Sequence, residues 1–240
     1  MYKPIANEIF HVHTWRCGHA GSEKDYEYIE SAIRLGASRI VFTDHCPFPG
    51  DPFRSRMKIE QLPEYLDTLS RFKDRYKMEI EILIGLEAEY LPSFHEYYPE
   101  LLKKDELDLL ILGQHMYEHE TGGWSFADED KSQEYEGLCK AIVEGIKTDC
   151  FDVVAHPDRS FRRCKEWTDK MKQASNQIIE EAQKHNVLLE KNYSSMRHKN
   201  YYWNQFWEKV ATENSIYGYD AHSVSEMERI FNTKGGKANE

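Results

Sequence analysis

Apolar and polar positions along the chain follow two periods, one typical of strands and one typical of helices. Short apolar runs predict buried strands, and longer stretches with apolar residues three and four positions apart predict amphipathic helices. The expected strands span residues 9–14, 39–43, 79–88, 107–113, 151–155, 187–191 and 215–219. The expected helices span residues 24–35, 59–76, 97–103, 132–148, 167–184, 200–214 and 224–231.

The expected elements alternate strictly, as seven strand-then-helix units in one series. Such alternation predicts an α/β fold with a parallel sheet and helices on its outside. Gly36 follows the first helix, where glycine is a common stop signal. We find no linker and no sequence repeat of fixed length. We therefore expect one domain over residues 1–232, followed by a frayed tail over residues 233–240.

Composition narrows the class of protein. The chain has 240 residues, 40% of them hydrophobic and 13% aromatic, which predicts a well-packed globular domain rather than a disordered one. No apolar run approaches the roughly 20 residues that span a bilayer, so we expect no membrane partner. The start of the chain has none of the features of a signal peptide. Five cysteines, with no C-x-x-C pair, favour a reducing cytoplasm.

The chain carries a formal net charge of −11. An acidic protein repels the phosphates of nucleic acids, so we expect no nucleic-acid partner. A small anionic substrate can still bind where metal cations reverse the local sign of charge. Nothing in the sequence indicates the oligomeric state.

Histidines and carboxylates concentrate where the expected strands end. His11 and His13 are two positions apart on the first strand, so both side chains should face the same way. Six of the seven strand ends deliver an imidazole or a carboxylate. The full set is His11, His13, His19, His45, Glu87, His115, His156, Asp220 and His222.

These nine groups can meet only if the sheet closes, which favours a barrel over an open sheet. Imidazole and carboxylate ligands suit Zn, Mn or Fe(II), and nine ligands imply two or three ions. Each piece alone has a plainer explanation, since an H-x-H pair is more often two surface residues. Glu89 is expected to lie beside the ligands or in solvent rather than to be a ligand. Cys17 and Cys46 are expected to be small packing residues.

Arginines follow two of the strand ends. Arg159, Arg162 and Arg163 come after His156, and Arg197 comes after the sixth strand. A guanidinium matches phosphate oxygens with paired donors. The alternative for each arginine is a solvated basic loop, but the neighbouring expected ligands favour Arg159 and Arg197 as phosphate-binding residues.

Taken together, the segments HVHT, TDH, GLEAE, AHP and DAH, with His19 and His115, resemble the PHP (polymerase and histidinol phosphatase) superfamily. The resemblance runs from His11 to His222 and is specific as a set. It implies a distorted seven-stranded (β/α)7 barrel, similar to a TIM barrel. It also implies three sets of ligands: His11, His13, Glu87 and Asp220 for one ion, Glu87, His115 and His156 for a second, and His19, His45 and His222 for a third.

The GLEAEY and LGQH segments look most like those of the monofunctional histidinol-phosphatases. This resemblance implies hydrolysis of L-histidinol phosphate, with catalytic roles for Glu87, Asp220, His222, Arg159 and Arg197. The acid that protonates the leaving alcohol stays open between His222 and a metal-bound water. Lys191, Tyr193 and Tyr219 depart from the family pattern near the expected substrate pocket, so they bear on which substrate is used.

Three alternatives stay open. The first is a phosphoesterase of the same superfamily that acts on another small substrate, such as a sugar phosphate, a nucleotide phosphate or a phosphodiester. The second is a metal-binding or interaction module without catalysis. The third is a protein-tyrosine phosphatase, although such relatives have differently spaced motifs.

Overall fold

The computed structural model describes residues 2–198 and 200–237. Its seven strands are β1 (Glu8–Val12), β2 (Arg39–His45), β3 (Glu81–Ala88), β4 (Leu109–Leu112), β5 (Val153–Val154), β6 (Leu188–Asn192) and β7 (Ser215–Gly218). Its α-helices are α1 (Asp25–Leu35), α2 (Leu62–Tyr76), α3 (Tyr97–Leu101), α4 (Glu134–Ile146), α5 (Asp169–His185), α6 (Asn204–Trp207) and α7 (Val224–Lys237). Every strand is followed by one of these helices, as the sequence predicts.

The chain divides into two compact units. The β1–β3 unit consists of residues 3–87, 103–109 and 218–237, and the β4–β7 unit consists of residues 2, 88–102 and 110–217. Both units are assembled from separate stretches of the chain, which explains why the sequence shows no linker. The expectation of one domain over residues 1–232 stays a prediction.

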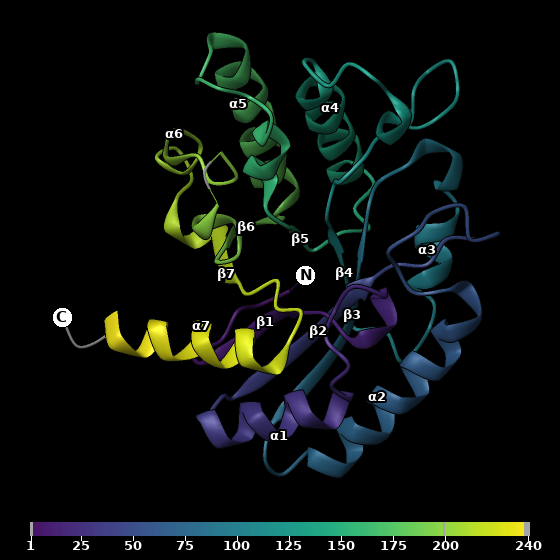
Figure 1. The fold of residues 1–240 in the computed structure, drawn as a ribbon, viewed down its shortest axis with the longest axis vertical. Helices are drawn as coiled ribbons and strands as arrows, with labels where there is room; N and C mark the ends of the chain where they lie inside the picture. Colours follow the sequence, from purple (N-terminus) through teal and green to yellow (C-terminus); the bar gives the residue numbers. More distant parts are fainter. Residues whose placement is uncertain (1, 199, 238–240) are drawn as a thin grey trace. The chain divides into compact units, whose positions relative to one another are not determined.

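The β1–β3 unit is built on parallel strands. Ile9 pairs with Ile40 and Ile40 with Ile82, and all three side chains are buried. Helices α1, α2 and α7 belong to the same unit (Figure 1). Helix α1 ends at Gly36, whose φ of 78° is left-handed, so the expected stop signal is confirmed.

The outer edge of β1 is also hydrogen-bonded. Tyr219 N donates to Phe10 O, Ala221 N donates to His11 O, and His13 N donates back to Ala221 O. The residues after β7 thus extend the sheet onto β1, and they lie in the same unit as β1.

The strand order is β1-β2-β3-β4-β5-β6-β7, which is chain order. With the bonds from residues 219–221 to β1, this is the connectivity of a closed (β/α)7 barrel. The expected fold class is therefore confirmed.

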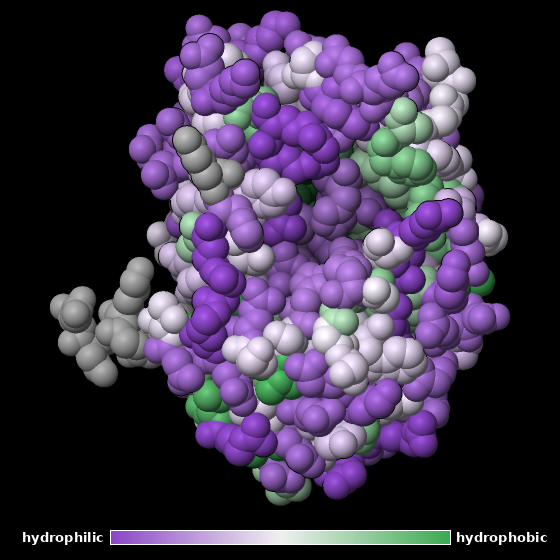
Figure 2. Space-filling view, in the orientation of Figure 1, coloured by the Kyte–Doolittle hydropathy of each residue, from purple (hydrophilic) through white to green (hydrophobic). Residues whose placement is uncertain are grey.

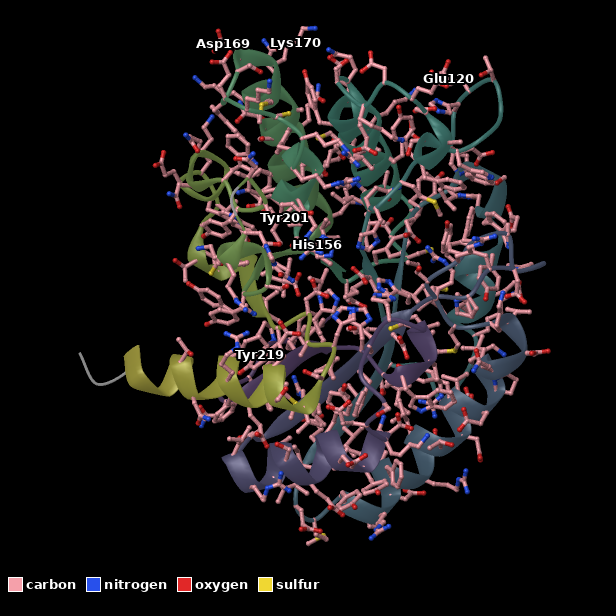
Figure 3. The ribbon with its side chains drawn as sticks, viewed as in Figure 1. Glu120, His156, Asp169, Lys170, Tyr201 and Tyr219 are labelled. Carbon is pink, nitrogen blue, oxygen red and sulfur yellow. The ribbon has the colours of Figure 1, made fainter. Side chains whose placement is uncertain are left out.

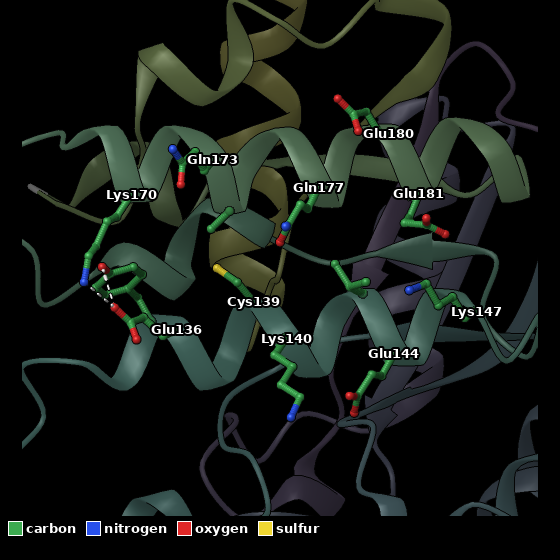
Figure 4. A pocket seen from close by; sticks show the side chains of 13 residues that line it. Glu136, Cys139, Lys140, Glu144, Lys147, Lys170, Gln173, Gln177, Glu180 and Glu181 are labelled. Carbon is green, nitrogen blue, oxygen red and sulfur yellow. Dashed lines mark hydrogen bonds and ion pairs between the residues drawn. The ribbon is translucent and has the colours of Figure 1, made fainter.

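In the β4–β7 unit, helices α4 and α5 run side by side and leave a surface groove of about 610 Å³ between them (Figures 1 and 4). Lysines and glutamates alternate along this groove, and Lys170 pairs with Glu136 at 3.5 Å. Charges of opposite sign that alternate in this way are typical of a solvated helix surface, so we place no ligand site in the groove.

Two expected helices differ from the structure. The predicted helix over residues 200–214 is wrong, since only Asn204–Trp207 is α-helical and Thr212–Asn214 is a short 3-10 turn. Trp203 and Ala211 have extended backbones that end the helical run on either side. The final helix is longer than expected and reaches Lys237, so residues 233–237 are helical. The rest of the expected tail, residues 238–240, lies outside the described residues.

The visible surface of each unit is mostly hydrophilic (Figure 2), in keeping with the net charge of −11. Within the described residues, no helix combines the length and the apolar character that a membrane crossing requires.

Candidate metal centre

A distortion in β1 brings the first two histidines together. The pairing of β1 with β2 shifts register between Phe10 and Val12, and His11 has a left-handed φ of 71°. The Nε2 atoms of His11 and His13 lie 3.0 Å apart, and both rings are buried. The prediction that these rings converge is confirmed. Their placement depends on a β-bulge as well as on the alternation of side chains along the strand.

Two carboxylates face this histidine pair. Glu87, near the end of β3, places Oε2 at 3.6 Å from the Nε2 atoms of both His11 and His13. Asp220, after β7, places Oδ1 at 3.3 Å from His13 Nε2 and 3.8 Å from His11 Nε2. Glu87 also lies 3.0 Å from Nδ1 of His45, which ends β2. Glu87 therefore contacts three imidazoles of the predicted set.

A second group of imidazoles contains His19, His45 and His222. The Nε2 atoms of His19 and His222 are 3.0 Å apart. Nδ1 of His19 lies 3.2 Å from Cys17 O, and Nδ1 of His222 lies 3.0 Å from Asp220 O. A carbonyl can only accept, so both Nδ1 atoms carry the proton and both Nε2 atoms present lone pairs. Two lone pairs facing each other at this distance are the arrangement that a shared cation would stabilise.

The donor set fits divalent metal ions. Ligand atoms around one Zn²⁺ at 2.0–2.2 Å are at most about 4.4 Å apart. Three triplets made only of predicted ligands in the β1–β3 unit have all their donor atoms within 4.8 Å of one another, close to this limit. They are His11, His13 and Asp220; His13, His45 and Glu87; and His19, His45 and His222. The β1–β3 unit thus brings together seven of the nine predicted ligands.

Burial and neighbouring charge set the protonation of two of these histidines. Burial lowers the pKa of His13, but hydrogen bonding to Asp220 and Asp44 outweighs this effect and raises the pKa to about 9. His222 shows the opposite balance, since burial and then the nearby charge of His13 lower its pKa to about 3. A neutral His222 with its Nε2 lone pair exposed suits a metal ligand better than the acid for a leaving alcohol.

Cys17 lies near this cluster, with its Sγ within 4.8 Å of donor atoms of His13 and His222. Burial, followed by the charge of Asp44, raises the pKa of the Cys17 thiol to about 12. A thiol must lose its proton to bind a metal, so the environment of Cys17 disfavours that role. The buried position agrees with a packing residue.

His115 and His156 lie in the β4–β7 unit. Their ring centroids are 5.1 Å apart, and Glu89 Oε1 lies 3.0 Å from His115 Nδ1. His156 follows β5 (Figure 3), and its backbone N–H donates to Glu190 of β6 at 3.0 Å. This unit therefore places the two remaining predicted ligands side by side.

Three predicted ligands have left-handed backbones, namely His11, His156 and Asp220, with φ of 71°, 35° and 51°. This conformation is uncommon for residues other than glycine and is costly unless the surroundings hold it in place. Backbone strain that coincides with expected ligands supports a functional role for these three positions.

Arg159 is held in place before any ligand binds. Its guanidinium donates to Asn192 Oδ1 at 3.1 Å and to Ser195 Oγ at 2.8 and 3.1 Å, and it lies over the ring of Tyr201. Asn192 in turn donates to Glu190, the residue that accepts from His156. The predicted phosphate-binding arginine is thus linked by hydrogen bonds to a predicted ligand.

The other arginines differ in their surroundings. Arg162 and Arg163 both form ion pairs with Glu134, at 3.0 and 2.9 Å, so the carboxylate of Glu134 partly offsets their positive charge. Arg197 is exposed and borders a surface hollow of about 350 Å³. Its predicted contact with phosphate stays a prediction.

Two of the residues that depart from the family pattern, Lys191 and Tyr193, have aromatic neighbours that are not among the contacts of Arg159. Glu190 and Asn192 face His156 and Arg159, whereas Lys191 lies over the rings of Trp207 and Tyr217. Tyr193 stacks on Tyr217 at 5.3 Å. Alternation along β6 therefore places Lys191 on the opposite face from Glu190 and Asn192, and Tyr193, directly after the strand, shares the neighbour Tyr217 with Lys191. Tyr219, in the other unit, is completely buried.

A buried network behind the histidines was not anticipated from the sequence. Thr14 Oγ1 donates to Asp44, whose other oxygen lies 3.7 Å from His13 Nδ1. Arg16 donates to Thr14 at 3.1 Å and to both oxygens of Asp25 at 2.8 Å. The only sign of this network in the sequence was the position of Asp44, directly before the predicted ligand His45.

Comparison with known proteins agrees with this arrangement. The chain is 34% identical over 161 residues to a probable histidinol-phosphatase of Deinococcus radiodurans, which covers 62% of this chain and 59% of that protein. It is 32% identical over 92 residues to the histidinol-phosphatase of Bacillus subtilis, which covers 36% of this chain and 34% of that protein. The match thus spans less than two thirds of either relative.

Solved structures share the fold at low sequence identity. A protein described as a histidinol phosphatase from Listeria monocytogenes superposes with a TM-score of 0.77 at 19% identity, covering 94% of this chain and 99% of that chain. The histidinol phosphate phosphatase of Lactococcus lactis, solved with Zn, L-histidinol and phosphate, gives a TM-score of 0.68 at 19% identity, covering 96% and 94%. The PHP domain family model matches residues 10–194. The chain therefore belongs to the PHP domain family.

Proposed function

We propose that this protein is a metal-dependent phosphatase that hydrolyses L-histidinol phosphate to L-histidinol and phosphate. The observation that carries the proposal is the convergence of five imidazoles and two carboxylates in the β1–β3 unit, with like donor atoms 3.0 Å apart. The names of the relatives at 34% and 32% identity supply the substrate.

The ligand assignment is part of the proposal. His11, His13, Glu87 and Asp220 would hold one divalent ion, and His19, His45 and His222 would hold another. The family resemblance assigns His115 and His156, together with Glu87, to a further ion. Zn, Mn or Fe(II) would all suit imidazole and carboxylate ligands. Bound divalent ions would polarise the phosphoryl oxygens and lower the pKa of a bound water.

Arg159 would bind the phosphate of the substrate. Its side chain is already oriented by Asn192, Ser195 and Tyr201, so little rotamer freedom is lost when an anion arrives. The planar guanidinium can offer two donors to one phosphate, and its charge would offset the charge of the substrate. Arg197, exposed after β6, would be a second phosphate contact, with less support from its surroundings.

The experiment that tests this function is phosphate release measured as kcat/KM for L-histidinol phosphate against a panel of sugar phosphates, nucleotide phosphates and bis(p-nitrophenyl) phosphate. We expect at least a 100-fold preference for L-histidinol phosphate, which corresponds to roughly 2.7 kcal/mol of differential transition-state binding. A flat profile would retain the phosphatase and discard the substrate. No release from any phosphoester by the metal-loaded protein would favour a non-catalytic metal-binding module.

A further inference from the structure

Glu89 lies beside the predicted ligand His115, although it is not one of the nine predicted ligands. Glu89 directly follows β3 and is only 1% exposed. Its Oε1 lies 3.0 Å from Nδ1 of His115. A buried carboxylate is costly unless it is hydrogen-bonded, and here the imidazole supplies a bond.

The backbone around both residues is braced so that this distance is fixed. The side chain of Gln114 accepts from Tyr90 N at 2.9 Å and donates to Tyr90 O at 3.1 Å. It thereby ties the residue after Glu89 to the residue before His115. Arg162 donates to His115 O at 3.3 Å and holds the carbonyl on the other side.

The contact with Glu89 favours one tautomer of His115. An ionised carboxylate only accepts hydrogen bonds, so Nδ1 is the protonated nitrogen and Nε2 keeps its lone pair. Imidazoles that bind metals commonly donate their other ring N–H to a carboxylate, which fixes both the tautomer and the ring orientation. The Glu89–His115 contact has the geometry of such a pair.

We propose that Glu89 is a positioning residue for His115, which holds Nε2 of that ring ready for a divalent cation. The proposal builds on the proposed metal-dependent function, because it deepens the role of one predicted ligand. Glu89 would act through His115 and would not itself contact the substrate or the reacting atoms.

The chain offers a matched control for this pair. His119 and Asp128 form another imidazole–carboxylate contact in the same unit, with Nε2 and Oδ1 2.8 Å apart. His119 is outside the predicted ligand set. The variant Asp128→Asn therefore removes a similar charge from a similar contact without touching His115.

The first test reads the tautomer of His115 by ¹⁵N NMR of its ring nitrogens in the metal-free protein. We expect the Nδ1–H form in the parent protein, retention of that form in Glu89→Gln, whose amide oxygen can still accept, and a shift toward the Nε2–H form in Glu89→Ala. Asp128→Asn should leave the His115 signals unchanged. An unchanged tautomer in Glu89→Ala would overturn the proposal.

The second test is zinc affinity, measured by competition with a chelator on the same variants. Loss of such a carboxylate typically weakens metal binding about 10- to 100-fold. We expect that loss in Glu89→Ala, a smaller loss in Glu89→Gln and none in Asp128→Asn. Equal affinity in Glu89→Ala and the parent protein would overturn the proposal, and so would an equally large loss in both Glu89 variants.

The two experiments separate this inference from the proposed function. The tautomer is measured without metal or substrate, so it does not depend on phosphatase activity. If the Nδ1–H form depends on Glu89 but no phosphoester is hydrolysed, the function fails and the positioning role stands.

Discussion

The Nε2 atoms of His19 and His222 lie 3.0 Å apart, although 203 positions separate the two residues in the chain. Each ring has its Nδ1 next to a backbone carbonyl, so both rings turn a lone pair toward the other. Protonation of His222 does not relieve this contact near neutral pH, because its pKa is lowered to about 3. A divalent cation shared between the two rings would relieve it.

Glu87 is the carboxylate whose loss should matter most. It lies within 3.6 Å of His11, His13 and His45. We expect Glu87→Gln to reduce turnover on the order of 10²-fold or more, because a negative charge shared by several ligands and their ions is lost. Steady-state phosphate release with metal content determined on the same sample is the measurement. Glu81→Gln, on the same strand but paired with Arg39, is the control and should retain full turnover.

Arg159 should contribute through the shape of its guanidinium and not only through its charge. We expect Arg159→Lys to lower kcat/KM for a phosphomonoester on the order of 10²-fold, since lysine keeps the charge but loses the paired donors. Arg163→Lys is the control from the same loop, where the side chain pairs with Glu134. If both variants behaved like the parent protein, Arg159 would not be the phosphate-binding residue.

Asp158 makes stability depend on pH in a definite direction. Burial raises its pKa from 3.8 to about 7, and its Oδ2 accepts from Trp203 N and Trp207 Nε1. The folded state therefore binds the proton more tightly than the unfolded state, so the free energy of unfolding should fall as pH rises from about 4 to about 7. The destabilisation should be fully present above pH 7.

Asp158→Asn removes this pH dependence, because an amide does not ionise. Its oxygen can still accept both hydrogen bonds, from Trp203 N and Trp207 Nε1. We expect Asp158→Asn to be more stable than the parent protein at pH 8, by up to a few kcal/mol, and similar at pH 4. Asp158→Leu should be less stable than Asp158→Asn at both pH values, by about 1–3 kcal/mol, since two buried N–H groups lose their acceptor. Urea unfolding at pH 4 and pH 8 measures the free energy of unfolding of the parent protein and of both variants. Lower stability of Asp158→Asn at pH 8 would contradict this account.

Replacing only one partner of the buried ion pair of Arg16 and Asp25 should lower the free energy of unfolding. Their side chains are 1% and 4% exposed, so Arg16→Met leaves a buried carboxylate without its counterion. We expect Arg16→Met to reduce the free energy of unfolding by about 3–5 kcal/mol. Adding Asp25→Asn should recover part of that loss. A loss below about 1 kcal/mol in urea unfolding of Arg16→Met would show that the pair is not important for stability.

The order of elements was predictable because local periodicity and tertiary packing agree for most of this chain. Helix α1 was predicted to within one residue, since an amphipathic pattern ends at Gly36. The helix expected over residues 200–214 was wrong for the opposite reason. Trp203, Phe206 and Trp207 have helical spacing, yet Trp203 is extended, and its N–H is bonded to Asp158, 45 positions earlier. Such a long-range contact leaves no local signal in the sequence.

The candidate ligands were predictable because strand ends converge in this class of fold, so a residue's place along a strand fixes its destination. The residues that orient the ligands were harder to find. Asp44 has only its place before His45 to mark it, and its contact with His13 is visible only in the structure. Glu89 was expected to lie beside the ligands or in solvent, and its contact with His115 agrees with the first of these. The bulge at His11 was also invisible, because nothing in HVH marks a left-handed backbone.

The measurement that tests the central claim most directly is phosphate release by the protein before and after metal removal, with bound metal determined by elemental analysis. We predict two or three divalent ions per chain, loss of activity when a chelator removes them, and recovery when Zn, Mn or Fe(II) is returned. Metal-free protein that releases phosphate at the rate of the untreated protein would contradict the account.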